Sequence, residues 1–214
     1  MILDKRADLG HGDVKKLLFS LSVPTITSQI VNMLYNLVDR VFIGHMQPAE
    51  TVGKLALTGV GVCLPIIMVI SAFASLMAIG GAPRASIAEG AGESEKSERI
   101  MGNCLTMLVI TALVLTVLFE SFAEPLLLMF GASENTVGYA LDYMRIYALG
   151  TIFVQLTLGM NAYITAQGFA TVSMKTVLIG ALLNTALDPL FIFVLGLGVR
   201  GAALATVISQ AVSA

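Results

Sequence analysis

Charged residues are scarce in this sequence of 214 residues. Only 12% of the residues are charged, whereas 57% are hydrophobic. A soluble globular chain carries about a quarter charged residues, so the low charge excludes an ordinary soluble enzyme, a disordered chain and a nucleic-acid binder. The mean hydropathy of +0.88 indicates a membrane protein instead.

Cysteine is scarce as well, and motifs for catalysis are missing. The two cysteines, Cys63 and Cys104, both lie inside apolar runs, which favours packing over a disulfide framework. The first sixteen residues are polar and the apolar run after them is too long for a signal-peptide core, so we expect no cleaved signal. Without a glycine-rich phosphate loop, a metal-ligand cluster or a nucleophile elbow, the sequence predicts no enzyme and no cofactor.

Long apolar runs are abundant. A bilayer core about 30 Å thick needs about 20 apolar residues as a helix. Hydropathy therefore predicts an all-α membrane protein with six spans, at residues 17–43, 55–80, 102–122, 138–165, 174–196 and 200–214. The last span reaches Ala214 without a closing loop, so we expect the sequence to be a fragment. The polar stretch 81–100 is expected to be a connector at the membrane surface.

Lysine and arginine are distributed unevenly over the alternate loops. Eight fall in the tail and in the second-to-third and fourth-to-fifth loops: Lys5, Arg6, Lys15, Lys16, Arg84, Lys96, Arg99 and Lys175. Three fall in the other loops: Arg40, Lys54 and Arg200. Cytoplasmic loops carry the excess of bases, so the amino terminus is predicted to be cytoplasmic. Arg145 lies inside the fourth span, where we expect it to pair with Asp142 one turn earlier.

Two carboxylates interrupt the apolar spans. The first ends a polar stripe whose members recur every three or four residues, namely Ser28, Asn32, Tyr35 and Asp39, with Asn36 beside them. Such spacing places the side chains on one helical face, which in a membrane must look into the bundle or a water-filled cavity. The alternative for Asp39 is an interfacial ion pair with the adjacent Arg40.

The second carboxylate belongs to a similar stripe in the fifth span. Its members, at four-residue spacing, are Thr176, Gly180, Asn184 and Asp188. Pro189 follows, and it is expected to kink the helix and free a carbonyl near Asp188. A carboxylate, a carboxamide and a freed carbonyl would together suit a small cation.

Depth in the membrane relates these acids to residues of two other spans. Counted from the outer ends of their spans, Asp39 lies about 6 Å deep, Tyr143 about 8 Å, Thr206 about 9 Å and Asp188 about 12 Å. The four side chains would converge if the helices pack as a bundle. The alternative is that the hydroxyl and amide groups only form hydrogen bonds between helices.

Several of these motifs resemble the multidrug and toxic compound extrusion (MATE) family. The first span, with Pro24, Ser28-Gln29 and the run Tyr35–Gly44, resembles the opening helix of that family, and Asn184–Pro189 resembles its fifth-helix signature. The stretch Arg84–Arg99 and the run Gly201–Thr206 extend the resemblance over the whole chain, nearest to bacterial drug exporters of the staphylococcal type.

The resemblance implies the amino-terminal six-helix lobe of a twelve-helix, two-lobe transporter in the cytoplasmic membrane. Such transporters export amphipathic organic cations in exchange for protons or sodium ions, and the carboxy-terminal lobe would be the partner missing from this sequence. The residues that match the family's cation site, with a sodium ion at Asp188 if sodium is the coupling ion, are Asp39, Asn184, Asp188 and Thr206. The implied cavity or substrate contacts are Asn32, Tyr35, Asn36, Tyr143 and Asn161, the last lying inward of the others.

Two other functions remain open at this point. A lipid-linked oligosaccharide flippase of the same superfamily would bind an anionic diphosphate and should line its cavity with arginine and lysine. The only base in mid-span is Arg145, so a cationic substrate fits better. A non-transporting membrane scaffold would leave the polar stripes without a purpose.

Overall fold

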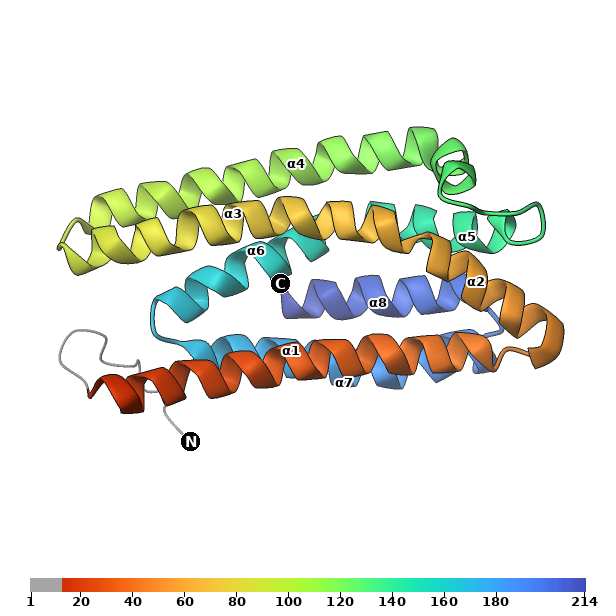
Figure 1. The fold of residues 1–214 in the computed structure, drawn as a ribbon, viewed down its shortest axis with the longest axis horizontal. Helices are drawn as coiled ribbons and strands as arrows, with labels where there is room; N and C mark the ends of the chain where they lie inside the picture. The colour runs from red at the N-terminus through yellow and green to blue at the C-terminus, as the bar shows by residue number, and fades with distance from the viewer. Residues whose placement is uncertain (1–12) are drawn as a thin grey trace.

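A computed structural model describes residues 13–214, and within that range the chain is helical without strands. The elements in chain order are α1 (Val14–Gly44), η1 (Ala49–Gly53), α2 (Lys54–Val62), α3 (Leu64–Gly90), α4 (Ser94–Met129), α5 (Val137–Leu149), α6 (Thr151–Ala166), α7 (Ala170–Pro189), η2 (Leu190–Val194) and α8 (Val199–Ser213). Here α denotes an α-helix and η a π-helical segment. The helices form one elongated bundle with their axes close to its long dimension (Figure 1).

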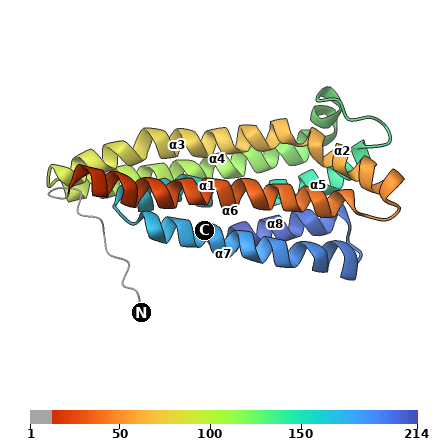
Figure 2. The same cartoon turned by 60° about the horizontal axis from the view of Figure 1, so that its bottom comes forward.

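Helices far apart in the sequence lie side by side in this bundle. The first helix, α1, packs along α7, while α3 packs against both α4 and α6. α8 lies in the middle of the bundle, where it contacts α5, α6 and α7 (Figure 1). Turning the molecule places α1 in front, with α3 and α4 above it and α7 and α8 below (Figure 2). The two polar stripes predicted for the first and fifth spans therefore belong to neighbouring helices.

The connections alternate between the two ends of the bundle. Residues 45–53, 130–136 and 195–198 connect helices at one end, and residues 91–93 and 167–169 connect them at the other (Figure 1). The second end is where α1 begins. It carries Lys15 and Lys16 of α1 and the three bases of the stretch 81–100, which are Arg84, Lys96 and Arg99. Lys5 and Arg6, which entered the prediction of orientation, lie outside the described residues.

Large apolar side chains cover the outside of the bundle. On α1, Leu18 is 63% exposed, Phe19 is 67% exposed and Met33 is 74% exposed. Within the described residues, four segments are long and apolar enough to cross a membrane, and the bent pair of α5 and α6 makes a fifth. α8, with 15 residues, occupies the position of the predicted sixth span. The chain is therefore a multi-pass membrane protein, as its composition predicts.

The stretch 81–100 is not the surface connector that its composition suggests. α3 continues through the first half of the stretch, and only residues 91–93 separate it from α4. Ala82, Ala85 and Ala88 recur every three residues and are buried. Small side chains let membrane helices approach closely, and this alanine face packs α3 against its neighbours. Gly81 lies on the same buried face, whereas Gly90, Gly92 and the glutamates that suggested a loop are exposed.

The fourth predicted span is bent rather than straight. α5 and α6 meet at an angle of 58°, with Gly150 between them. A side chain at Gly150 would collide with Val207 of α8, so glycine allows the bend to lie directly against the central helix. The bend turns α6 toward α3 while α5 stays against α8.

The proline after Asp188 marks a change in helix type. α7 keeps its α-helical form to Pro189, and the π-helical segment η2 continues for five residues. A proline removes a backbone donor and disturbs the preceding turn, so a local change of hydrogen-bonding pattern is expected there. Gly201 at the start of α8 lies against the backbone of Phe191, where an added Cβ would be only 2.7 Å from the Phe191 carbonyl carbon. The observed change at Pro189 is a π-helical segment that packs on α8, and residues 170–194 form one continuous span.

Candidate functional site

A buried hydrogen-bonded group lies where α7 meets α8. Asn184 is 1% exposed and Asp188 is fully buried. The Asn184 Nδ2 donates to Asp188 Oδ1 at 3.3 Å and to Thr206 Oγ1 at 3.5 Å. Thr206 in turn donates to the Ala202 carbonyl at 3.1 Å, within its own helix. One amide therefore connects the carboxylate of α7 to the hydroxyl of α8.

Asp39 of α1 joins this group from the other side. It is buried, 6% exposed, on the helix that packs along α7. The charge of Asp39 acts on Asp188, while the adjacent Arg40 is the charged group that acts on Asp39 itself. We refer to Asp39, Asn184, Asp188 and Thr206 as the acid cluster. The four residues assigned to a cation site from the sequence are thus brought together from three helices.

Several oxygens of the acid cluster have no hydrogen-bond donor. Asp39 Oδ1, Asn184 Oδ1 and Asp188 Oδ2 are buried and lack a partner among the described residues. Buried polar atoms are nearly always paired, so these three unpaired acceptors are suited to bind a proton or a cation that prefers oxygen ligands. Residues 13–214 contain no group of three or more His, Cys, Asp and Glu that could hold a metal ion. An ion at the acid cluster would be held by carboxylate, amide and hydroxyl oxygens, which suits an alkali or alkaline-earth ion better than a transition metal.

Tyr143 of α5 borders the acid cluster. Its side chain is buried, 4% exposed, and stacks on Tyr147 with ring centroids 5.9 Å apart. The Tyr143 hydroxyl lies next to Thr206, and the charge of Asp39 acts on it. α5 therefore contributes Tyr143 to the surroundings of Thr206.

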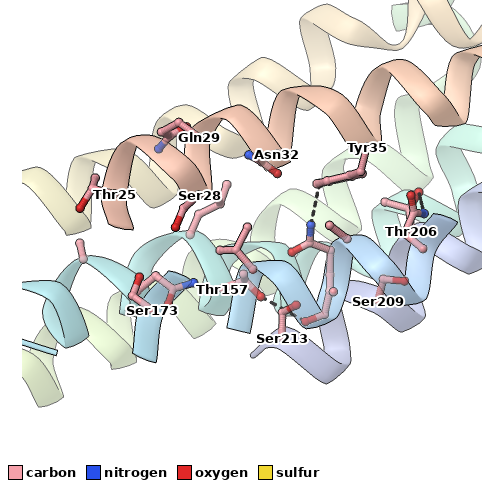
Figure 3. Close-up of a pocket in the computed structure, with 18 of the residues that line it drawn as sticks. Thr25, Ser28, Gln29, Asn32, Tyr35, Thr157, Ser173, Thr206, Ser209 and Ser213 are labelled. Carbon is pink, nitrogen blue, oxygen red and sulfur yellow. Dashed lines mark hydrogen bonds between the residues drawn. The ribbon is translucent and has the colours of Figure 1, made fainter. Parts of the chain in front are cut away.

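A cavity of about 350 Å³ opens between α1, α6, α7 and α8. Such a volume lies within the range of small-molecule sites, roughly 300–1,000 Å³. The polar residues that line it include Thr25, Ser28, Gln29, Asn32, Tyr35, Thr157, Asn161, Ser173, Asn184, Thr206, Ser209, Gln210 and Ser213. All of these bear hydroxyl or amide groups, and no charged side chain lines the cavity. Thr25 and Ser173 lie toward one end and Thr206 toward the other (Figure 3).

Two residues belong to both the cavity and the acid cluster. Asn184 and Thr206 line the cavity, and the same Asn184 amide bonds to Asp188. A molecule in the cavity that hydrogen-bonds to Asn184 would compete with the carboxylate for its donors. The uncharged cavity is therefore connected chemically to the buried charges.

Residues of α8 that the sequence reading missed complete the cavity. Gln210 Nε2 donates to the Tyr35 hydroxyl at 3.1 Å and links α8 to α1. Thr157 of α6 donates to the Gln210 carbonyl at 3.1 Å. Ser209 Oγ and Gln210 Oε1 are buried without a partner among the described residues. The three- and four-residue spacing from Thr206 to these residues was the available signal.

The remaining residues that the sequence predicts as cavity or substrate contacts do not all line the cavity. Asn32 and Tyr35 line the cavity. Asn36 is exposed, does not line the cavity, and donates to the Asn32 carbonyl of its own helix at 2.6 Å. Asn161 lines the cavity and accepts from Thr176 at 3.2 Å. Its partner lies three turns before Asp188 on α7, so Asn161 is separate from the acid cluster.

The predicted pair of Asp142 and Arg145 is wrong. Asp142 instead accepts from Arg200 at 2.8 Å, across the contact between α5 and α8. The packing of α5 against the first turn of α8 brings this more distant base to the carboxylate. Arg145 is exposed and does not line the cavity.

Comparison with known proteins identifies relatives over almost the whole chain. The MatE family profile matches residues 24–190. The multidrug export protein MepA of Staphylococcus haemolyticus is 30% identical over 203 residues, which cover 95% of this chain and 44% of that protein. MepA of Staphylococcus aureus is 26% identical over 201 residues, with 94% of this chain and 44% of that protein covered.

Solved structures agree with these sequence relatives. A MATE structure in complex with MaD3S superposes with a TM-score of 0.86 at 30% identity, over 94% of this chain and 44% of that one. An outward-facing multidrug resistance MATE transporter of the MOP superfamily gives a TM-score of 0.85 at 30% identity, with the same coverage. The chain thus spans somewhat less than half the length of the relatives it matches.

Proposed function

The chain belongs to the MatE family, as an amino-terminal lobe, and we propose that it works within an antiporter that exports amphipathic organic cations. In this proposal the exchanged ion is a proton or a sodium ion, and no cofactor or catalytic activity is assigned. The transporter lies in the cytoplasmic membrane with the amino terminus of this lobe on the cytoplasmic side. A carboxy-terminal lobe completes it.

The observation that carries the proposal is the contact between the acid cluster and the cavity. Three buried oxygens of the acid cluster have no hydrogen-bond donor among residues 13–214, and the cavity beside them has room for a small organic molecule. Asn184 and Thr206 belong to both. Ion and substrate can therefore affect each other's binding without sharing one volume.

Charge competition supplies the coupling in this scheme. Two nearby carboxylates in a medium of low dielectric constant repel each other and favour a cation. A proton or a sodium ion at Asp188, aided by Asn184 and Asp39, neutralises the site and weakens the attraction for an organic cation. Once the carboxylates are neutralised, the helices repack near Pro189, and the organic cation is released to the outside. Release of the ion to the cytoplasmic side restores the negative charge of the site. Each ligand shifts the equilibrium between the outward-facing and inward-facing states only through its different affinity for the two states.

A flippase of the same superfamily is not favoured by the lining of the cavity. An anionic diphosphate needs arginine or lysine, and the cavity within residues 13–214 is lined only by neutral side chains. The buried charges next to it are carboxylates, which would repel a diphosphate. A cationic substrate meets neither difficulty.

Transport by the complete protein tests the proposal. Inverted vesicles that contain wild type or Asp188→Asn would be given tetraphenylphosphonium under an imposed proton or sodium gradient. Wild type should move the probe when one of the two gradients is present, and the variant should lose gradient-dependent movement. Glu134→Gln, which removes an exposed carboxylate from the loop before α5, is the matched control and should behave as wild type.

Two outcomes would contradict the proposal. Unchanged coupled transport in Asp188→Asn would remove the acid cluster from the mechanism. A well-folded wild type that moves no organic cation under either gradient would favour a different substrate class, the flippase included.

A further inference from the structure

A second hollow lies at the opposite end of the bundle from the acid cluster. It is an open groove of about 760 Å³ between α3 and α4, near the turn that connects them. Its lining includes Leu76 and Met77 in the middle of α3, and Arg84, Ile87 and Lys96 nearer the turn. We refer to it as the α3–α4 groove. It shares no lining residue with the cavity described above.

Arg84 is the first charged residue along α3, in a groove that is otherwise lined mainly by apolar residues. Leu76 is 62% exposed and Ile87 is 73% exposed, so apolar side chains face outward at both levels. Arg84 lies eight residues after Leu76, about 12 Å further along the helix axis. An apolar wall with a base at the level where the sequence turns polar matches the interface between acyl chains and headgroups.

The net charge of the groove is positive. Lys96 is paired with Glu93 at 2.7 Å, and both residues line the groove. These two charges offset each other. Arg84 is exposed and forms no ion pair with any residue between 13 and 214. One uncompensated guanidinium therefore remains, and a guanidinium binds phosphate oxygens through two parallel hydrogen bonds.

The floor of the groove is open because it contains glycine. A Cβ added at Gly80 would meet nothing within 4 Å, whereas one added at the neighbouring Gly81 would strike the Tyr163 hydroxyl. Gly81 therefore serves the packing of α3 on α6. Gly80 serves no contact of this kind, and its lack of a side chain leaves room beside Leu76 and Met77.

We propose that the α3–α4 groove binds an anionic phospholipid, with the phosphate at Arg84 and an acyl chain along Leu76, Met77 and Gly80. The acyl chain accounts for the apolar wall and the open floor, and the phosphate accounts for the unpaired base. This inference goes beyond the proposed function and does not depend on which substrate is exported.

Lipid binding to the complete transporter tests the inference. Native mass spectrometry would measure the affinity of the purified protein for phosphatidylglycerol and for phosphatidylcholine with the same acyl chains. Wild type should prefer phosphatidylglycerol by about fivefold, the contribution of one basic residue near an anionic lipid surface. Arg84→Gln should abolish this preference, and Arg84→Lys should keep part of it. Gly80→Leu should weaken the binding of both lipids, because its side chain fills the floor.

Arg99→Gln is the matched control. Arg99 lies at the same end of α4 and carries the same charge, but it pairs with Glu95 at 3.2 Å and does not line the groove. It should leave the lipid preference unchanged. Equal losses in Arg84→Gln and Arg99→Gln would show general surface attraction and overturn the inference. So would an unaltered preference in Arg84→Gln, which is the result expected if the companion lobe covers the groove.

A competition with inorganic phosphate separates a lipid from a free anion. Phosphate at millimolar concentration should not displace phosphatidylglycerol, since the acyl chain contributes to its binding. If phosphate displaces the lipid and Gly80→Leu has no effect, the site recognises a free phosphate group, and the lipid proposal is wrong.

Discussion

The acid cluster and the far end of the cavity both take residues from α7 but differ in charge. At one end Asp188 is fully buried, with a second carboxylate nearby. At the other end Ser173 and Asn161 present neutral groups to a cavity that opens along α1. The difference separates two tasks. Concentrated charge selects a small cation, while a wide neutral surface accepts organic molecules of varied shape.

The two regions meet at Asn184 and Thr206, so the separation is not complete. Asn184 donates to Asp188 and also faces the cavity. A change of charge at the acid cluster will therefore alter the hydrogen bonds offered to a molecule in the cavity. The comparison predicts that variants at the charged end change ion dependence, whereas variants at the neutral end change affinity alone.

The largest effect is expected from Asp39→Asn. Loss of one carboxylate removes the repulsion that makes the site favour a cation, so coupled transport of tetraphenylphosphonium should fall roughly tenfold or more, which corresponds to at least about 1.4 kcal/mol. Asn161→Ala, at the neutral end, should weaken binding of the probe but preserve the ion dependence. Transport measured at several ion gradients distinguishes the two. Equal loss of ion dependence in both variants would contradict the assignment of ion binding to the charged end alone.

A smaller effect, on stability, is expected where the neutral end packs closely. A Cβ at Gly180 would meet the Ser213 hydroxyl and would lie 3.2 Å from the Ser209 carbonyl oxygen of α8. Gly180→Ala should therefore destabilise the protein by about 1–3 kcal/mol, the usual range for overpacking. In Gly102→Ala the added Cβ meets nothing within 4 Å, and alanine should stabilise the helix by about 0.5–1 kcal/mol. Unfolding in dodecyl sulfate measures both, and similar signs would contradict the packing argument.

Breaking the link between α8 and α1 should have a modest effect. Gln210→Leu removes the 3.1 Å hydrogen bond to Tyr35. Hydrogen bonds between membrane helices contribute about 0.6 kcal/mol on average, so the free energy of unfolding should fall by about that amount. Gln29→Leu removes another amide from the cavity without touching this link and serves as the control. The coupling ion should still compete with tetraphenylphosphonium in both variants. Loss of this competition in Gln210→Leu would mean that Gln210 takes part in ion binding.

The smallest effect is expected at the surface pair of Arg200 and Asp142. Both side chains are substantially exposed, at 63% and 40%. Exposed ion pairs contribute little to stability and weaken in salt. Arg200→Gln should leave coupled transport within about twofold of wild type and lower stability only at low salt. Arg145→Gln, which removes an exposed base without a described pair, should change neither. A large transport defect in Arg200→Gln would give the pair a role that its exposure does not suggest.

Much of the architecture follows from hydropathy and polar spacing. Runs of apolar residues predict the helical membrane fold, and the four-residue stripe ending at Asp188 predicts which face of α7 is buried. The stripe ending at Asp39 likewise predicts a buried acid, because an uncompensated charge is not tolerated in lipid. These features depend on one helix at a time and can be read from local sequence.

Features that depend on contacts between distant helices could not be read in this way. Asp142 pairs with a base 58 residues away because α5 packs on α8. Gln210 reaches Tyr35 across 175 residues for the same kind of reason. The stretch 81–100 looked like a loop because glycine, serine and glutamate dominate its composition and mask the periodic buried alanines. Tertiary packing determines these contacts. For the stretch 81–100, the alanines at three-residue spacing were the sequence signal for a buried helix.

The most direct test of the account is the competition between ion and organic cation at equilibrium. Binding of tetraphenylphosphonium to the purified complete transporter would be measured while sodium is raised or pH is lowered, in wild type and in Asp188→Asn. The account predicts that the affinity of wild type falls as the competing ion occupies the acid cluster, and that the affinity of the variant no longer depends on that ion. The same ion dependence in both proteins would contradict the account, because the coupling charge would then lie outside the acid cluster.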